Sequence, residues 1–517
     1  MPEDRAVKMF NKKLDKCCKV AIPRRQVAER TVPWWDSHLT HMRKKVMSAK
    51  KQLLRARKLH LVNVIDEYAN TYKRYSNKYL SDIKKRKKEA WQRFVDVEGN
   101  RDPWGIVYRI VREKVGNPSI WTALKLPDGS RTISLNETIN VLLHTCVPED
   151  NRSELSVECR ALKQKVDGYI NMNLEPRISL MEISNALSKF ENKEAPGLDN
   201  FKVKIVRELW RKRPEVIERL MNNCIDQRKF PRCWKEANLK IILKDQNRDR
   251  SLLSSYRPIA LLPVVKKLYE KTIVNRIQAT YKDAGLESPN QFGFKKGKGT
   301  HDAFLSLRRA LQFSDKKYII AIFIDIEGAF DNLWWPAILA RLVSAGCSTH
   351  ILKVAKSYFK CRKVLVQNKM KTYSRHMEKG CPQGSIIGPA AWIWTMDVVL
   401  NKLTENIPSE YGEFVAYADD LAWVMKGDTR SEILTYSERV IEILTWCNSH
   451  KLRISEKKTV AVQFKGSLDE SRFVIKLNGK NIKFVKNVKY LGIVIDNKQN
   501  YIEHVKYLEQ KLHNMFV

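Results

Sequence analysis

The sequence lacks two features that would have set its class at once, a long apolar run and a Cys-x-x-Cys pair. A membrane-spanning helix needs about 18 or more mostly apolar residues, and no stretch of the 517 residues approaches that length. The charged first residues lack the apolar core of a secretory signal peptide. The ten cysteines are scattered, as is typical of reduced thiols. We therefore expect an intracellular protein without a membrane anchor.

Two cysteines and two histidines near the N-terminus could be imagined as a zinc site. They are Cys17, Cys18, His38 and His41. Adjacent cysteines followed by a long gap fit the ligand spacing of zinc fingers poorly. We do not expect a structural zinc ion.

Acidic residues are scarce relative to basic ones. The chain has 95 Lys and Arg against 57 Asp and Glu, a formal net charge of +38. Such an excess favours a polyanionic partner, nucleic acid above all. Residues 1–100 carry 26 basic and 11 acidic side chains. A single run, such as residues 84–88, could be an ordinary solvated helix face, but the overall excess is harder to explain in that way.

Residues 1–115 have apolar residues at helical spacing among many lysines and arginines, which predicts a basic helical region. Tyr68, Tyr72, Tyr75 and Tyr79 recur at steps of four, three and four. This stripe indicates a packing face more often than a platform for stacked bases. Residues 116–200 are mixed in character and lead into a denser region.

Two short segments place acids at the ends of predicted strands. "YIIAIFID" (318–325) is an apolar run that ends in Asp325, and "FVAYADDLAWVM" (414–425) predicts two paired strands with Asp419 and Asp420 at their turn. Asn478-Gly479 indicates a further hairpin, and "KYLGIVID" (489–496) one more strand. "GCPQGSIIGPAAWIW" (380–394) predicts a loop running into a buried helix. This order predicts an α+β fold with an antiparallel sheet and helices on one side of it.

Three carboxylates that meet at one sheet edge would repel each other unless cations were bound. Mg²⁺ prefers oxygen ligands, and two such ions about 4 Å apart can clamp the attacking and leaving oxygens of a phosphoryl displacement. An isolated Asp-Asp pair would more often be a plain polar turn. Other blocks in the same chain decide between these alternatives.

The blocks resemble those of a reverse transcriptase, in the family's order. Their amino-acid sequences, including "APGLDN" and "AIFIDIEGAFDNLWW", are similar to those of non-LTR (LINE-type) retrotransposons, and among these to arthropod-like elements. The resemblance is strong over residues 190–500, and it implies a right-hand polymerase with fingers and palm. Residues 201–500 would then be fingers and palm, and residues 501–517 the start of a thumb helix. The blocks are "SYRPIALLPVVKKLYEKTIVNRI", "QFGFKKGKGTHDA", "AIFIDIEGAFDNLWW", "GCPQGSIIGP", "FVAYADDLAWVM", "LRISEKKTVAVQF" and "KYLGIVID".

The resemblance assigns the metal and catalytic roles. Asp325, Asp419 and Asp420 would be the catalytic carboxylates, and the carbonyl of Ile326 would complete the site for two Mg²⁺ ions, with Mn²⁺ as a possible substitute. Lys458 matches a lysine proposed to protonate the pyrophosphate leaving group. The further acids Glu327 and Asp331 are expected to start a helix and to support the ligands.

The resemblance also implies the contacts with substrates, namely dNTPs, an RNA template and a DNA primer. Lys244 and Arg257 would hold the triphosphate, and Phe330 would exclude a 2′-hydroxyl, unless it is simply a core residue. Gln383 and Gly384 would lie against the nucleotide and template. The primer end would be gripped by Tyr490, Leu491 and Gly492.

The chain is expected to be part of an element, because it shows neither endonuclease blocks nor most of a thumb. Two alternatives to an active polymerase therefore remain: a non-catalytic RNA-binding remnant and a maturase-like splicing factor, the latter disfavoured by the wording around Asp199 and Asp325. The basic N-terminal region would bind RNA, and nuclear residence is expected from the family. The sequence gives no indication of oligomeric state.

Overall fold

The computed structural model describes residues 2–22, 34–59, 62–101, 123–150, 156–245, 248–367, 371–467 and 474–516. The chain divides into two compact units. One consists of residues 1–14 and 121–517, and the other of residues 15–120. Within the described residues, no helix combines the length and the apolar character that crossing a bilayer requires.

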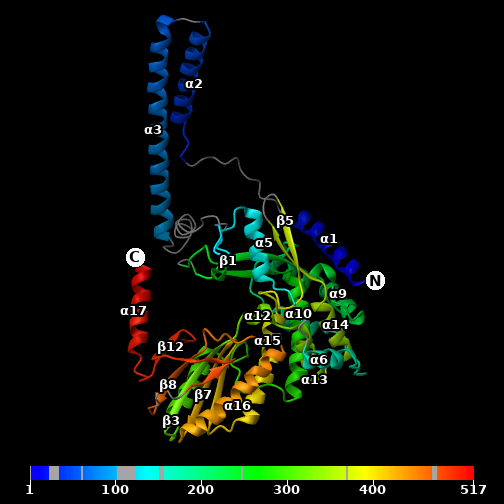
Figure 1. Ribbon diagram of the computed structural model, residues 1–517. Helices are drawn as coiled ribbons and strands as arrows, with labels where there is room; N and C mark the ends of the chain where they lie inside the picture. The colour runs from blue at the N-terminus through cyan, green and yellow to red at the C-terminus, as the bar shows by residue number, and fades with distance from the viewer. Residues whose placement is uncertain are drawn as a thin grey trace. The chain divides into compact units, whose positions relative to one another are not determined.

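The unit of residues 15–120 contains two helices that pack against each other, α2 (Ser37–Lys58) and α3 (Val62–Arg101) (Figure 1). Asp36 starts α2 by accepting a hydrogen bond from the Leu39 N–H at 2.8 Å, as an N-cap residue does. An ion pair joins Arg86 of α3 to Asp36 at 3.1 Å. The four tyrosines of the predicted stripe are half-buried, as residues of a packing face would be.

The larger unit is built around a five-stranded sheet in the order β11-β8-β3-β7-β6. All neighbouring strands are antiparallel except β11 and β8, which are parallel. Figure 1 shows β3, β7 and β8 side by side. The strands are β3 (Tyr318–Asp325), β6 (Gly412–Tyr417), β7 (Asp420–Gly427), β8 (Val460–Lys465) and β11 (Lys483–Phe484).

Both faces of this sheet are covered, so the expectation of helices on one side is wrong. The face with Ile319, Ala321 and Phe323 packs against α11 (Thr300–Gln312) and the hairpin of β12 (Asn487–Tyr490) and β13 (Ile493–Asp496). Helices α15 (Ile387–Asn406) and α16 (Arg430–Ser449) contact β6 and β7 without joining that cluster, so they cover the opposite face. This burial on two faces explains why β3 is continuously apolar.

Several predicted elements are confirmed and one is corrected. Strands β6 and β7 pair as expected, and Asn478-Gly479 turns between β9 (Lys476–Leu477) and β10 (Lys480–Asn481). The segment "KYLGIVID" is not one strand. Leu491 and Gly492 have φ of 47° and 88°, and they reverse the chain between β12 and β13, which pair with each other. The helix expected within residues 380–394 begins at Ile387.

A second sheet has four strands in the order β2-β1-β4-β5, with β1 and β4 parallel. These strands are β1 (Glu236–Leu243), β2 (Tyr256–Leu261), β4 (Arg362–Gln367) and β5 (Thr372–Met377). The remaining helices are α1 (Glu3–Ala21), α5 (Leu135–Cys146), α6 (Val157–Asp167), α7 (Leu180–Leu187), α8 (Val203–Lys212), α9 (Pro214–Asp226), α10 (Val264–Asp283), α12 (Ala329–Asn332), α13 (Trp335–Ser344), α14 (Thr349–Phe359) and α17 (Ile502–Phe516), with 3₁₀ turns η1 (Arg232–Trp234) and η2 (Leu253–Ser255).

Candidate active site

The predicted acids meet because β3 and β7 are paired in a fixed register. Asp325, the last residue of β3, lies opposite Asp420, the first residue of β7. Asp419 precedes Asp420 in the tight turn after β6. The backbone beyond Asp325 continues beside residues 453–455, where Ile326 bridges Ile454 and the Ser455 N–H donates to the Asp325 carbonyl at 2.8 Å.

The segment after β3 turns sharply into the short helix α12. Gly328 has φ of 56°, in the left-handed region that favours glycine, and it stands directly before α12. This turn brings Phe330 and Asp331 back toward the strand end, and both line the same cavity as Asp325.

The loop at residues 380–386 is fastened to its neighbours through its backbone. The Cys381 N–H donates to the Phe330 carbonyl at 2.9 Å, and the Ala260 N–H of β2 donates to the Gln383 carbonyl at 2.7 Å. Gly384 has φ of 112°, and a Cβ there would lie 2.7 Å from the Ala260 oxygen. The hydrogen bond from Ala260 to Gln383 holds the loop close to β2. The absence of a side chain at Gly384 allows this close approach.

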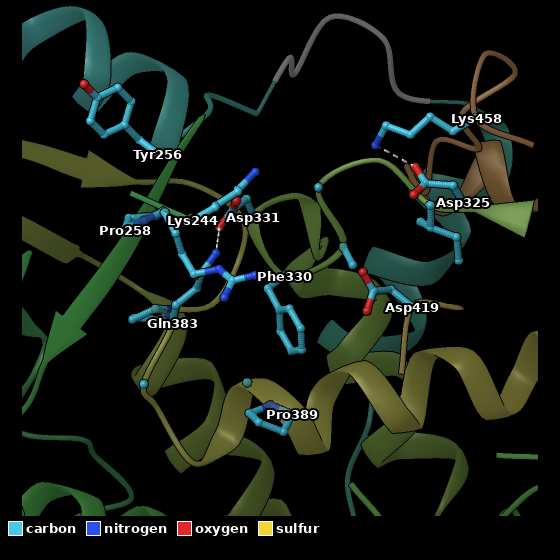
Figure 2. A pocket seen from close by; sticks show the side chains of 17 residues that line it. Lys244, Tyr256, Pro258, Asp325, Phe330, Asp331, Gln383, Pro389, Asp419 and Lys458 are labelled. Carbon is cyan, nitrogen blue, oxygen red and sulfur yellow. Dashed lines mark hydrogen bonds and ion pairs between the residues drawn. The ribbon is translucent and has the colours of Figure 1, made fainter. Parts of the chain in front are cut away.

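These elements enclose one cavity of about 470 Å³. Figure 2 shows the Asp325 and Asp419 carboxylates on one side of it, Lys244 and Gln383 on the other, and Phe330 between them. Nine of the ten residues predicted to bind metal or nucleotide line this cavity: Lys244, Arg257, Asp325, Ile326, Phe330, Gln383, Gly384, Asp419 and Lys458.

The tenth residue, Asp420, does not line the cavity. Although Asp420 is exposed, protein atoms reduce the hydration of its carboxyl and, together with the charges of Asp419 and Asp325, raise its pKa to about 6. Burial raises the pKa of Asp419, and the charge of Asp325 raises it further, whereas Arg257 and Lys458 lower it. The acids are therefore close enough to oppose one another's ionisation.

Cations surround the acids. The Lys458 ammonium donates to the Asp325 carboxylate at 3.0 Å. Loss of hydration and the charges of Arg248, Arg257 and Lys458 lower the pKa of Lys244, while Asp331 raises it. Positive charges that disfavour one another in this way form a site for an anion with several charges.

Asp331 lines the cavity next to Phe330. Burial raises its pKa to about 6, and its carboxylate accepts a hydrogen bond of 3.4 Å from the Gln383 amide. The bond links α12 to the loop at residues 380–386. Glu327 is exposed, and its backbone N–H donates to the Arg453 carbonyl at 2.8 Å.

Phe330 is half-buried between two other aromatic residues. Its ring lies 5.9 Å from Phe294 in an edge-to-face arrangement and 6.0 Å from Trp392. These contacts fix the ring while one part of it still faces the cavity. The packing and the cavity contact occur together, so the core interpretation and the nucleotide interpretation do not exclude each other.

The hairpin predicted to grip the primer is separate from the cavity lining. The Tyr490 side chain is buried, with its ring 5.4 Å from Phe323 and its hydroxyl donating to the Val415 carbonyl at 3.3 Å. Leu491 is half-buried and Gly492 exposed. Tyr490 thus anchors the hairpin to the sheet, and the turn itself presents Leu491 and Gly492.

Sequence reasoning missed several residues that shape the cavity. Tyr256 and Pro258 flank the predicted Arg257, and Pro389 follows the loop at residues 380–386. Tyr256 and Pro258 read as ordinary strand residues, because neither carries a charge and both are buried in β2. Only their place next to Arg257 could have indicated them.

The donors suit a hard divalent cation, although side chains alone do not complete its shell. Asp325, Asp419 and Ile326 line one cavity, and carboxylate and backbone oxygens bind Mg²⁺ with water and phosphate completing the shell. Among the residues that the structure describes, no three His, Cys, Asp or Glu side chains are grouped to hold an ion. Cys17, Cys18, His38 and His41 are among the described residues, and no three of them are grouped.

Comparison with known proteins identifies this domain. Residues 242–495 match the family model "Reverse transcriptase (RNA-dependent DNA polymerase)". Over 495 residues the chain is 31% identical to a "Retrovirus-related Pol polyprotein from type-1 retrotransposable element R1" of Bradysia coprophila, covering 95% of this chain and 47% of the relative. A "Putative 115 kDa protein in type-1 retrotransposable element R1DM" of Drosophila melanogaster is 28% identical, covering 99% and 48%.

A third relative is an "RNA-directed DNA polymerase from mobile element jockey" of Drosophila melanogaster, 28% identical, with 98% of this chain and 56% of the relative covered. The chain thus spans about half the length of these curated relatives. Reverse transcriptases use divalent metal ions, in keeping with the oxygen donors of the cavity. Residues 242–495 thus form a reverse transcriptase domain, and the chain is similar to the polymerases of non-LTR retrotransposable elements.

Proposed function

We propose that this chain is an RNA-directed DNA polymerase that extends a DNA primer on an RNA template. The observation that carries the proposal is the cavity in which Asp325 and Asp419 face Lys244 across Phe330. Arg257 lines the same cavity. Such a cavity combines donors for a cation with charges for a triphosphate. The primer 3′-hydroxyl would attack the α-phosphorus of a dNTP, and the bond to pyrophosphate would break.

We propose Mg²⁺ as the cofactor, held as two ions by Asp325, Asp419 and the Ile326 carbonyl, with Mn²⁺ as a substitute. Asp420 adds negative charge next to Asp325 and Asp419. When bound, the ions would supply charge neutralisation at the attacking and leaving oxygens. Their binding would also relieve the repulsion that raises the pKa of Asp419 and Asp420.

The other side chains have roles that their chemistry suits. The planar guanidinium of Arg257 and the ammonium of Lys244 hold the triphosphate. Lys458, within reach of Asp325, delivers a proton to the departing pyrophosphate. Phe330 lies under the sugar and excludes a 2′-hydroxyl. Gln383 and Gly384 contact the nucleotide and template.

Two surfaces outside the cavity complete the proposal. The turn of Leu491 and Gly492, anchored by Tyr490, contacts the primer end. The basic residues of α2 and α3 bind RNA phosphates, since α2 carries eight Lys and Arg and no acid. The basic runs also support nuclear residence, which imaging of a fluorescent fusion in insect cells tests.

Primer extension with purified chain tests the proposal. The parent, with an RNA template, dNTPs and Mg²⁺, is compared with Asp419→Ala and with the matched control Asp428→Ala, since Asp428 follows the far end of β7 and pairs with Lys316 at 2.8 Å. We expect extension by the parent and control and at least a 10³-fold loss in Asp419→Ala. Equal RNA binding by all three with no extension would instead indicate a non-catalytic RNA-binding protein.

A further inference from the structure

Gln291 is a fully buried amide in the segment that precedes α11, and it has no role in the chemistry proposed above. Its backbone runs beside β6. The Ala416 N–H donates to the Asn290 carbonyl at 2.9 Å, and the Phe292 N–H donates to the Ala416 carbonyl at 2.7 Å. This short parallel bridge fixes the segment against the strand that leads to Asp419.

The Gln291 side chain then continues along that strand into the turn. Its Oε1 accepts hydrogen bonds from the N–H of Ala418 at 3.1 Å and of Gly293 at 2.8 Å. Its Nε2 donates to the Ala418 carbonyl at 3.5 Å. One buried amide therefore contacts both polar backbone groups of the residue directly before Asp419.

Ala418 adopts a conformation that alanine disfavours. Its φ is 57°, in the left-handed region where a Cβ crowds the backbone. A non-glycine residue stays there only when its surroundings hold it. The loop also presses on the turn from the other side, because a Cβ at Gly293 would lie 2.2 Å from the Ala418 nitrogen. Gln291 and the Gly293 backbone thus hold the turn in its strained form.

We propose that Gln291 is a positioning residue for Asp419, fixing the Ala418 peptide so that the next carboxylate faces the cavity. The inference rests on the proposed function, in which Asp419 binds the metal. If the hydrogen bonds of the Gln291 side chain are removed, Ala418 can relax toward ordinary backbone angles and rotate Asp419 away from Asp325. A displacement of about 1 Å costs on the order of 10²-fold in rate.

The chain offers a matched control for the removal of a buried amide. Asn222 of α9 is 5% exposed and holds the Ile178 backbone in the same manner. Its Oδ1 accepts from the Ile178 N–H at 2.7 Å, and its Nδ2 donates to the Ile178 carbonyl at 3.0 Å. Neither residue lines the catalytic cavity. Asn222→Leu therefore removes similar bonds without moving the turn.

The experiment compares Gln291→Met with Asn222→Leu in thermal stability and in kcat and KM for dNTP. We expect both variants to lose stability, but only Gln291→Met to lose kcat, by about 10- to 100-fold, with KM changed less than about threefold. Gln291→Asn keeps an amide, although one carbon shorter, and should regain part of kcat; it also serves if the Met variant does not fold. Unchanged kcat in Gln291→Met, or equal kcat losses in both substitutions, would overturn the proposal.

Amide hydrogen exchange tests the positioning even if no polymerase activity is found. A peptide covering residues 414–420 should exchange faster in Gln291→Met than in the parent, and at the parent's rate in Asn222→Leu. An unchanged rate in Gln291→Met would contradict the clamp itself. A parent that exchanges as expected but extends no primer would instead contradict the proposed function.

Discussion

Gly384 gives the sharpest test of how the loop at residues 380–386 shapes the proposed nucleotide site. Its φ of 112° is one that L residues rarely adopt, and a Cβ would meet the Ala260 oxygen at 2.7 Å. In Gly384→Ala, the backbone strain costs about 1–3 kcal/mol. Loss of the hydrogen bond from Ala260 to Gln383 costs about 0.5–1.5 kcal/mol more. The combined cost is about 1.5–4.5 kcal/mol.

Because Gln383 and Gly384 line the cavity, this cost should fall on nucleotide incorporation. At about 1.4 kcal/mol for each tenfold change, kcat/KM for dNTP should decrease by roughly 10- to 1,600-fold. Steady-state single-nucleotide incorporation on a primed RNA template measures it, and the affinity for the primed template should stay within about threefold of the parent value.

Gly285→Ala is the control, since Gly285 also has a positive φ, of 67°, but no atom within 4 Å of its added Cβ. It reports the backbone strain without the collision. If Gly384→Ala incorporates dNTPs as well as the parent, or if Gly285→Ala loses as much activity, the loop does not shape the nucleotide site through its close approach to β2.

Four further predictions follow from single contacts. Phe330→Val should raise the incorporation of NTPs relative to dNTPs at least tenfold in competition assays, because the ring fixed by Phe294 and Trp392 would no longer meet the 2′-hydroxyl; an unchanged ratio would assign the ring to the core alone. Lys458→Gln should lower kcat about 10²- to 10⁴-fold and also lower the Mg²⁺ concentration for half-maximal rate, because the ammonium no longer competes for Asp325; a higher Mg²⁺ requirement would contradict this. Burial raises the pKa of Asp397 to about 7, although Lys295 lies 3.7 Å away. The native state therefore keeps a proton on Asp397 that the unfolded state releases near pH 4, so the stability of the fold should fall as pH rises from about 4 to 7. Asp397→Asn should flatten that decline in melting experiments at a series of pH values. Replacing the five exposed residues Arg43, Lys44, Lys45, Lys50 and Lys51 of α2 with Ala should reduce the slope of log K against log salt for RNA by about 0.7 for each phosphate that α2 no longer neutralises; an unchanged slope would place the RNA elsewhere.

The strand-level part of the site could be predicted, because it depends on local patterns. An apolar run that ends in Asp325 and an Asp-Asp turn between two apolar runs fix strands and a hairpin by themselves. The pairing that sets Asp325 opposite Asp420 follows once the strands are adjacent. Lys244 and Arg257 needed the family resemblance, because their approach depends on the register of β1 and β2.

Other features were hidden from sequence reasoning for physical reasons. Asp419 lies in the turn and Asp420 is the first residue of β7, so adjacency in sequence did not show that Asp419 would line the cavity and Asp420 would not. The unbroken apolar run of β3 indicates burial on both faces of the sheet. The order of the elements nevertheless predicts helices on one side only. Gln291 begins the block "QFGFKKGKGTHDA", but nothing in the block indicated its contact, since a buried amide in an irregular segment has no periodicity and its partner is the backbone of Ala418.

The central claim is that metal ions held by Asp325 and Asp419 contact the phosphate that is transferred. Single-turnover incorporation of dNTPs with sulfur replacing either non-bridging α-phosphate oxygen tests it directly, because Mn²⁺ accepts sulfur more readily than Mg²⁺ does. We predict that one of the two sulfur isomers reacts slowly with Mg²⁺ and regains its rate with Mn²⁺, in the parent but not in Asp419→Ala. If neither isomer responds to the exchange of metal, the phosphate is not bound by ions at these carboxylates.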